Sequence, residues 1–165
     1  MNPHFRTDRG LFLATASIGL AAGSASTAWA AGAVLPAPQS LADELGRALE
    51  KGNPLVVMVS LEGCPFCKVA RDSYLEPLRR QDGMPVFQID MRRATTVRDF
   101  TGATLTHEQL VQAWRVTIAP TVLFFGPRGK EITARMEGGY IADFYGAYLD
   151  QRIEQARAVI KSAKP

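Results

Sequence analysis

The sequence contains only two cysteines and two histidines, and this scarcity argues against a metal centre. A structural zinc site needs about four nitrogen or sulfur ligands. Of the two histidines, His4 lies in a segment that we expect to be removed, which leaves His107. No cysteine is available for a structural disulfide beyond Cys64 and Cys67. We therefore expect no metal, no cofactor and a fold that is held by packing alone.

The net charge is also small, at +3 at pH 7, and the sequence does not suggest a clustered basic face of the kind that binds nucleic acid. We therefore expect no nucleic-acid partner. A mild local excess of arginine is interpreted as a solvated rim, with a docking patch for an acidic partner as the alternative. The arginines concerned are Arg79, Arg80, Arg92, Arg93 and Arg98.

Residues 1–30 have the pattern of a secretory signal peptide. Arg6 and Arg9 precede the apolar stretch Leu11–Ala22, and Ala28-Trp29-Ala30 has the small residues of a cleavage site. We expect cleavage after this site and export to the periplasm. The alternative is an uncleaved anchor in the inner membrane that faces the periplasm, because the uncharged stretch is long enough to span.

Cleavage would leave a short linker at residues 31–39, rich in Ala and Pro, and one domain at residues 40–165. Export would place this domain in an oxidising compartment. Both cysteines would then be available for function.

The most informative feature is Cys64-Pro65-Phe66-Cys67, which follows the apolar run Leu55–Leu61. Cysteines at positions i and i+3 share one helix face, near a separation that a disulfide tolerates. If Cys64 is the N-cap, its sulfur faces unpaired N–H groups and the positive end of the helix dipole, which favour the nucleophilic thiolate. Pro65 would stand at the first helical position, where proline is tolerated. The pattern predicts a redox dithiol; the alternatives are an inert structural disulfide and an unreactive pair.

Hydrophobic patterning predicts alternating helices and strands. Apolar runs and alternation predict four strands, namely Leu55–Leu61, Val86–Ile89, Thr121–Phe125 and a strand through Ile132, Ala134 and Met136. Capping residues and helical spacing predict four helices, which begin at Ser40, Cys64, Thr106 and near Ile141. This order predicts an α/β fold with three layers around a central mixed sheet.

Three local expectations accompany this order. Pro77 is expected to kink or end the helix that begins at Cys64. A small hairpin is expected around Thr101-Gly102. His107 is interpreted as a surface or cap residue, because nothing in the sequence ties it to the cysteines.

The order of elements resembles that of the thioredoxin superfamily, with Cys-x-x-Cys at the first strand–helix junction and Ala119-Pro120-Thr121 before the third strand. Gly129-Lys130 in the hairpin turn and Gly139-Tyr140 before the last helix add to the resemblance. It covers nearly all of Ser40–Lys161. It implies a thioredoxin fold, in which helices flank a central mixed four-stranded sheet, with an extra N-terminal helix.

A closer similarity is to the secreted thioredoxin-related proteins of the SoxW type. Three stretches carry it, namely Glu62–Lys68, Trp114–Thr121 and Gly139-Tyr140-Ile141 leading to Phe144.

The resemblance implies roles for individual residues. Cys64 would be the exposed attacking thiolate, and Cys67 would resolve the mixed disulfide. Pro120 would be the cis-proline of the superfamily, with an ordinary trans proline as the alternative. The Ala119 backbone would pair with an extended substrate segment. Further substrate contacts are expected from Pro65, Phe66 and Thr121.

Two positions depart from the superfamily pattern. Met58 stands where thioredoxins usually have a buried Asp, so proton removal from Cys67 would rely on water or on another group such as Glu62. Gly63 stands where Trp is usual, which should leave the attacking sulfur more open.

The function that we expect is an exported thiol–disulfide oxidoreductase, a reductase of protein disulfides in the periplasm. A membrane thiol transporter would resupply its electrons, and a monomer is expected. An oxidase or isomerase is a competing hypothesis, because the sequence does not set the reduction potential. So is a glutathione site, since Pro65-Phe66 is also a glutaredoxin-like dipeptide. A binding module without redox activity is the hypothesis from a different class.

Overall fold

The computed structural model describes residues 34–138 and 142–163. The expected signal peptide and the Gly139-Tyr140-Ile141 stretch lie outside the described residues. Among the helices that are described, none combines the length and the apolar character needed to cross a membrane.

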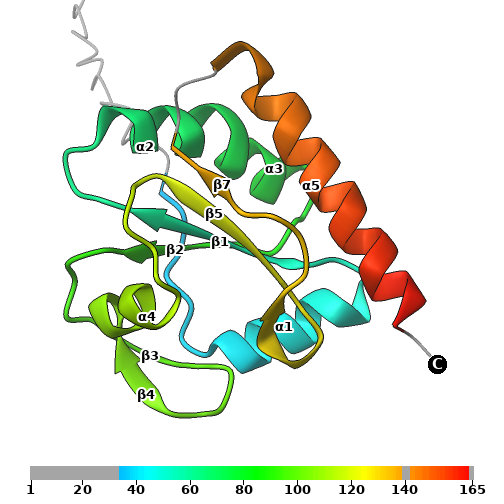
Figure 1. Cartoon of the computed structure of the whole chain (residues 1–165), viewed down its shortest axis with the longest axis horizontal. Coiled ribbons are helices and arrows are strands. Elements are labelled where there is room, and N and C mark those ends of the chain that lie inside the picture. The colour runs from blue at the N-terminus through cyan, green and yellow to red at the C-terminus, as the bar shows by residue number, and fades with distance from the viewer. Residues whose placement is uncertain (1–33, 139–141, 164–165) are drawn as a thin grey trace, which may run out of the picture. The chain divides into compact units, whose positions relative to one another are not determined.

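Figure 1 shows the order of the elements along the chain. The helical elements are α1 (Leu41–Glu50), α2 (Pro65–Ala70), the π-helical η1 (Arg71–Leu75), α3 (Glu76–Gln81), α4 (His107–Ala113), the 3₁₀ turn η2 (Pro127–Gly129) and α5 (Ala142–Ser162). The strands are β1 (Leu55–Ser60), β2 (Val86–Asp90), β3 (Thr96–Arg98), β4 (Thr104–Thr106), β5 (Thr121–Gly126), β6 (Lys130–Glu131) and β7 (Met136–Glu137).

The main sheet is mixed, as the sequence predicts. Its order is β2-β1-β5-β6, and β7 also pairs with β5. β1 runs parallel to β2, with Val56 opposite Val86, and antiparallel to β5, with Val57 opposite Leu123. Every residue of β1 and of β5 is buried, as expected for central strands that are covered on both faces.

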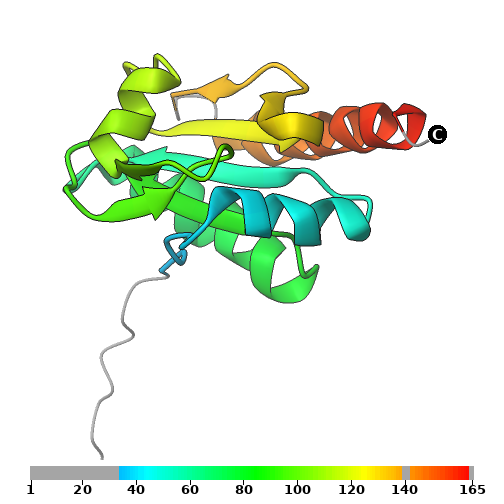
Figure 2. The same cartoon turned by 90° about the horizontal axis from the view of Figure 1, so that it is seen from below.

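Helices cover both faces of this sheet and create two hydrophobic cores. One core packs α2, η1 and α5 against one face and includes Met58, Cys67 and Leu149. The other packs α1 and α4 against the opposite face and includes Leu45 and Leu110. Figure 2 looks at the sheet from the side of α1 and α4. The three-layer arrangement is therefore confirmed, and the redox pair belongs to the core that contains α5.

The fourth strand is broken into two pieces, which corrects the prediction of one continuous strand through Ile132 and Met136. In β6, Glu131 is opposite Phe125, whereas in β7, Met136 is opposite Val122. Four residues on this strand therefore face only two on β5, which is a bulge. Because the two extra residues are an even number, the alternation of faces is the same on both sides of the bulge, so alternation alone could not reveal it.

The helix that begins after Cys64 continues past Pro77, with a wider turn before it. Residues Arg71–Leu75 form a π-helical turn between α2 and α3, and Pro77 lies in the first turn of α3. Proline has no N–H and its ring crowds the carbonyl four residues earlier, so a widened turn at this place relieves the conflict. Pro77 perturbs the helix there without ending it.

The interpretation of His107 as a surface or cap residue is wrong. Its side chain is fully buried, and Nδ1 accepts a hydrogen bond from the Asp90 N–H at 3.2 Å. His107 is the first residue of α4, after the N-cap Thr106, and it shares the inner face of that helix with Leu110. The histidine therefore fixes the start of α4 to the carboxyl end of β2.

Two smaller predictions concern a hairpin and the linker before the domain. The hairpin around Thr101-Gly102 is present as the antiparallel pair β3–β4. The described part of the expected linker, residues 34–39, lies against the domain: Leu35 is buried, and the Pro36 carbonyl accepts the Gln88 N–H at 2.9 Å.

Candidate functional site

The redox pair lies where three loops meet at one end of the sheet. β1 ends at Ser60 and leads into α2 through Leu61–Gly63, with the end of β2 on one side and the start of β5 on the other. Because β5 runs antiparallel to β1, its first residues lie at the same end of the sheet. The segment from Leu61 to Cys64 is thus flanked by the Ala119-Pro120 loop, which faces Cys64, and by the loop that follows Asp90, which lies beside Leu61 and Glu62.

Cys64 is the N-cap of α2, as the sequence predicts. Its Sγ accepts a hydrogen bond from the Cys67 N–H at 3.1 Å, and Pro65 opens the helix. Cys64 and Cys67 form a disulfide, with a Cα–Cα distance of 5.2 Å. The N–H groups at a helix start favour negative charge, so this position suits a thiolate once the bond is reduced.

The two sulfur atoms differ in how they meet solvent. Cys64 is partly exposed, whereas Cys67 is only 1% exposed and packs in the core with Met58. An incoming disulfide can therefore reach Cys64 and not Cys67. This difference fits the attacking and resolving roles that the sequence predicts for the pair.

The Ala119-Pro120 loop faces the pair. The peptide bond before Pro120 is cis, and the Ala119 carbonyl oxygen lies 3.9 Å from Cys64 Sγ. Thr121 is fully buried, and its hydroxyl donates to the Ile118 carbonyl at 2.7 Å. Direct contact between a substrate and the Thr121 side chain is therefore excluded, and this residue holds the loop in place instead.

Exposed apolar side chains border the partly exposed Cys64 and form what we call the apolar rim. Phe66 is 56% exposed and Ile118 is 45% exposed, and both flank the Cys64 position from α2 and from the Pro120 loop. Pro65 is exposed as well. Ile118 was not among the predicted site residues. Its position directly before Ala119-Pro120 is the signal that could have identified it.

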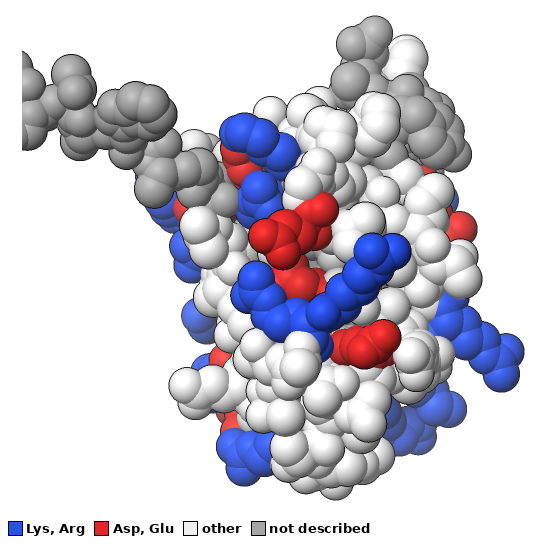
Figure 3. All heavy atoms as spheres, turned by 90° about the vertical axis from the view of Figure 1, so that its left-hand side faces the viewer, with Lys and Arg blue, Asp and Glu red and all other residues white. Residues whose placement is uncertain are grey.

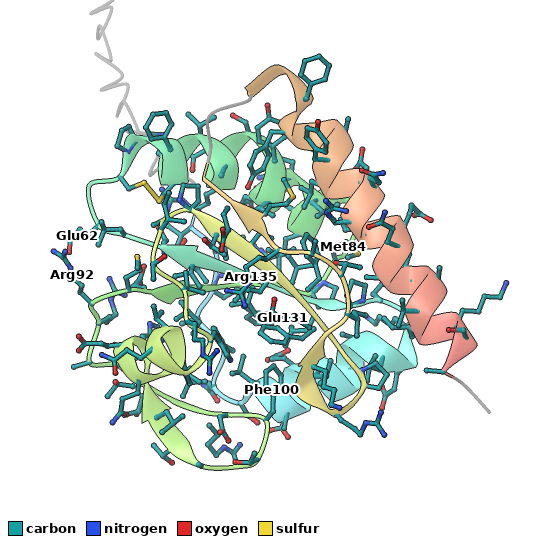
Figure 4. The ribbon with its side chains drawn as sticks, in the orientation of Figure 1. Glu62, Met84, Arg92, Phe100, Glu131 and Arg135 are labelled. Atoms are coloured by element: carbon teal, nitrogen blue, oxygen red, sulfur yellow. A yellow bond between two sulfur atoms is a disulfide. The ribbon has the colours of Figure 1, made fainter. Side chains whose placement is uncertain are left out.

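Among the residues that the structure describes, no acidic side chain lies buried beneath Cys67. Met58 stands at the position where the superfamily usually has a buried Asp, and it is fully buried. Glu62, the other proton acceptor considered from the sequence, is exposed on the loop before the pair. In Figure 4 its side chain points away from the disulfide.

A hollow of about 390 Å³ lies between the segments that follow β1 and β2. Its lining residues are Leu61, Glu62, Asp90, Met91, Arg92, Arg93 and Ala94. Figure 3 looks at this side of the molecule, where acidic and basic side chains gather near the centre. Asp90 and Arg93 form an ion pair at 3.2 Å. Arg92 and Arg93 were predicted only as part of a solvated rim or a docking patch. Apart from Glu62 as a proton acceptor, none of the lining residues was assigned to the redox site, because they come from two segments that only the fold brings together.

Residues 41–153 match the family model described as a thioredoxin-like domain. The chain belongs to this family. Since the match includes the redox pair, the Ala119-Pro120 loop and all strands of the main sheet, the thioredoxin fold expected from the sequence is confirmed. A cysteine pair at the start of the helix after β1 is consistent with a thiol–disulfide oxidoreductase.

Solved structures with a similar fold include several thioredoxins and one oxidoreductase. Thioredoxin from Fasciola hepatica is 19% identical, with a TM-score of 0.49 over 74% of this chain and 99% of that chain. The DsbH oxidoreductase is 18% identical, with a TM-score of 0.49 over 74% of this chain and 88% of that chain. The periplasmic thioredoxin SoxS from Paracoccus pantotrophus is 22% identical, with a TM-score of 0.42 over 62% and 98%. No curated protein sequence matches the chain.

Proposed function

We propose that this protein is an exported thiol–disulfide oxidoreductase that reduces disulfides in protein substrates. The Cys64 thiolate attacks a substrate disulfide and forms a mixed disulfide, and one substrate thiol leaves. Cys67 then attacks Cys64 Sγ, which releases the second substrate thiol and leaves the protein disulfide. Two electrons pass from the protein to the substrate in each cycle.

One observation carries this proposal: an accessible Cys64 sulfur caps α2 while its partner Cys67 is buried directly behind it. The N–H groups at a helix start favour a thiolate, which is the attacking species in disulfide exchange. A purely structural disulfide would need no such difference in exposure.

The substrate would lie across the apolar rim. The exposed Phe66 and Ile118 offer apolar contact, and the Ala119 backbone offers strand-like pairing beside the sulfur. Pro65 borders the same surface. An extended, partly apolar segment on each side of the substrate cysteine fits this surface best.

The direction of the redox reaction and the cellular location of the protein are part of the same proposal. The dipeptide Pro65-Phe66 has no histidine that would push the pair further toward a strong oxidant, which favours a reductase. The predicted signal peptide and the similarity to secreted proteins of the SoxW type favour the periplasm. There, a membrane thiol transporter would return electrons to the Cys64–Cys67 disulfide of a monomeric protein.

A trapping experiment tests the proposal. The Cys67→Ala variant should accumulate mixed disulfides with other exported proteins, because the resolving step is lost. The Cys64→Ala variant, which lacks the attacking sulfur, is the control and should accumulate none. Absence of mixed disulfides in Cys67→Ala would contradict the proposal. Equilibration with glutathione buffers would then decide direction, since a potential above about −180 mV would indicate an oxidase.

A further inference from the structure

β7 forms an open edge of the sheet beside the Pro120 loop. Within the part of the chain that the structure describes, β7 pairs only with β5, and the residue after it, Gly138, donates its N–H to the Pro120 carbonyl at 2.7 Å. Successive residues of an antiparallel strand direct their backbone groups alternately toward and away from the partner strand. The N–H and the carbonyl of Glu137 therefore point away from β5, toward the open edge, where an extended segment can pair with them.

A cavity of about 190 Å³ lies along this edge, between β7 and α5. In Figure 1, β7 lies between β5 and the first half of α5. The lining residues are Arg135, Met136, Glu137, Gly138, Tyr145, Tyr148 and Arg152. Pockets that hold small-molecule ligands or cofactors are usually larger, at about 300–1,000 Å³. The size of this cavity therefore suits a single large side chain.

The wall of the cavity combines apolar surface with hydrogen-bond donors. Met136 and Tyr148 supply apolar surface, and the Tyr148 side chain is 47% exposed. The Tyr145 hydroxyl and Arg152 Nε are buried without a hydrogen-bond partner among the described residues. Buried donors are rarely left unpaired in folded proteins. A bound peptide would supply both an apolar side chain and carbonyl oxygens that accept hydrogen bonds.

A short path connects the cavity with the position of the substrate cysteine. The Ala119 carbonyl oxygen lies 3.9 Å from Cys64 Sγ, and the next residue, Pro120, accepts the hydrogen bond from Gly138, which lines the cavity. An extended chain advances about 3.3 Å per residue, so about three to five residues lead from a cysteine at Cys64 to the cavity. A segment that pairs with Ala119 can therefore continue past Pro120 to the open edge of β7.

We propose that the protein substrate follows this path and inserts a large apolar side chain into the cavity between β7 and α5, with Met136 and Tyr148 as the residues that select it. The dithiol of Cys64 and Cys67 still performs the exchange, so this assignment rests on the proposed function. The preferred substrates are extended segments that carry an aromatic or large aliphatic residue about three to five positions from the reacting cysteine.

Disulfide-linked dimers of a short Gly/Ser peptide with one central cysteine test this selection. In each peptide a single Phe stands two to six positions from the cysteine, on either side, and the parent peptide has no Phe. The mature protein is reduced with dithiothreitol, desalted and mixed with each peptide at pH 7, and oxidation of its thiols is followed by acid quenching and mass spectrometry. Each rate is divided by the rate with bis(2-hydroxyethyl) disulfide, which is too small to reach the cavity, so that general changes in thiol reactivity cancel.

In the wild type, Phe at the fitting distance from the cysteine should raise this relative rate about five- to tenfold over the parent peptide, as for partial burial of one large apolar side chain. Tyr148→Ala should lose most of this gain. Val159→Ala removes an exposed apolar side chain of α5 that does not line the cavity, and this control should keep the gain.

A second pair of variants tests the backbone pairing. Glu137→Pro removes the N–H that points to the open edge, a change that edge strands tolerate. It should slow the reaction with every peptide about two- to tenfold, as for one lost hydrogen bond. Glu137→Ala keeps this N–H and should slow these reactions less.

Two results would overturn this assignment: no position of Phe raises the rate in the wild type, or the gain persists in Tyr148→Ala. A concentration-dependent dimer that dissociates in Tyr148→Ala would also overturn it, since a second copy of the chain would then occupy the cavity. In each case the protein could still reduce the parent peptide. If no disulfide oxidised its thiols, the proposed function itself would be wrong.

Discussion

Two sulfur atoms three residues apart have unequal surroundings, and this difference should be measurable in the reduced protein. The Cys64 sulfur accepts the N–H of residue 67 and is partly exposed, whereas Cys67 is 1% exposed. At pH 7, iodoacetamide should modify Cys64 in the Cys67→Ser variant about tenfold faster than it modifies the thiol of free glutathione, because the helix start favours the thiolate. Cys67 in the Cys64→Ser variant should react more slowly than glutathione, because reagent cannot reach it.

Unfolding in urea provides the control for this comparison. Both variants should then react at the rate of an ordinary thiol, since the helix and the core are lost. If Cys64 in the folded protein reacted no faster than glutathione, the helix start would not activate it.

The residues of this site differ in how far the sequence alone could identify them. The N-cap position of Cys64 follows from neighbours within three residues, so the sequence was sufficient. The position of Glu62 and Arg92 in one hollow was not predictable, because they lie in separate loops that the parallel pairing of β1 and β2 brings together. The burial of Thr121 was missed for a related reason, since the resemblance indicates that a residue belongs to the site and not which way its side chain points.

At the scale of single elements, His107 links α4 to the end of β2 in a way that depends on pH. Burial lowers the pKa of His107; nearby Arg93 acts in the same direction, and Asp90 opposes it. The folded protein therefore binds the proton more weakly than the unfolded chain, whose histidine has a pKa of about 6.5. The stability that neutral His107 contributes is present above pH 6.5 and is lost as pH falls below it. Protonation would also remove the acceptor of the Asp90 N–H.

The variant His107→Asn should separate this effect from packing. The oxygen of the asparagine side chain can accept the same N–H but is not protonated in this pH range. The substitution should lower the free energy of unfolding by about 1–3 kcal/mol at pH 7 through lost packing. The difference from the wild type in urea unfolding should shrink as pH falls from 7 to 5. A constant difference over this range would show that His107 does not titrate on unfolding.

Two elements show which part of the fold could be predicted from local pattern. The Thr106 capping box that starts α4 was recognised because its residues are three apart, and the structure contains both of its hydrogen bonds. The burial of His107 in the same turn was not recognised, although its spacing placed it on the apolar face with Leu110. The prediction was based on the lack of any link between His107 and the cysteines in the sequence, and it did not use this periodicity. Only the fold brings Nδ1 to the Asp90 N–H at the sheet edge, and Nε2 is buried without a hydrogen-bond partner.

At the scale of the whole molecule, the redox pair is part of the core that stabilises the domain. Cys67 and Ala70 of α2 pack with Val56 of β1 and Leu149 of α5. Any change at the pair therefore acts on the packing between the helices and the sheet. By thermodynamic linkage, the two redox forms differ in their free energy of unfolding by an amount fixed by the difference in reduction potential between the folded and unfolded chains.

This linkage predicts the sign of the redox effect on stability. If the protein is a reductase, folding favours the disulfide, so the oxidised form should unfold at a higher urea concentration than the form reduced with dithiothreitol. A folded potential about 60 mV below that of the unfolded chain corresponds to about 3 kcal/mol. The Cys64→Ser/Cys67→Ser double variant, which has no redox chemistry, should unfold at the same urea concentration with and without dithiothreitol. A reduced form more stable than the oxidised form would mean that folding favours the dithiol, as it does in an oxidase, and the reductase assignment would then be wrong.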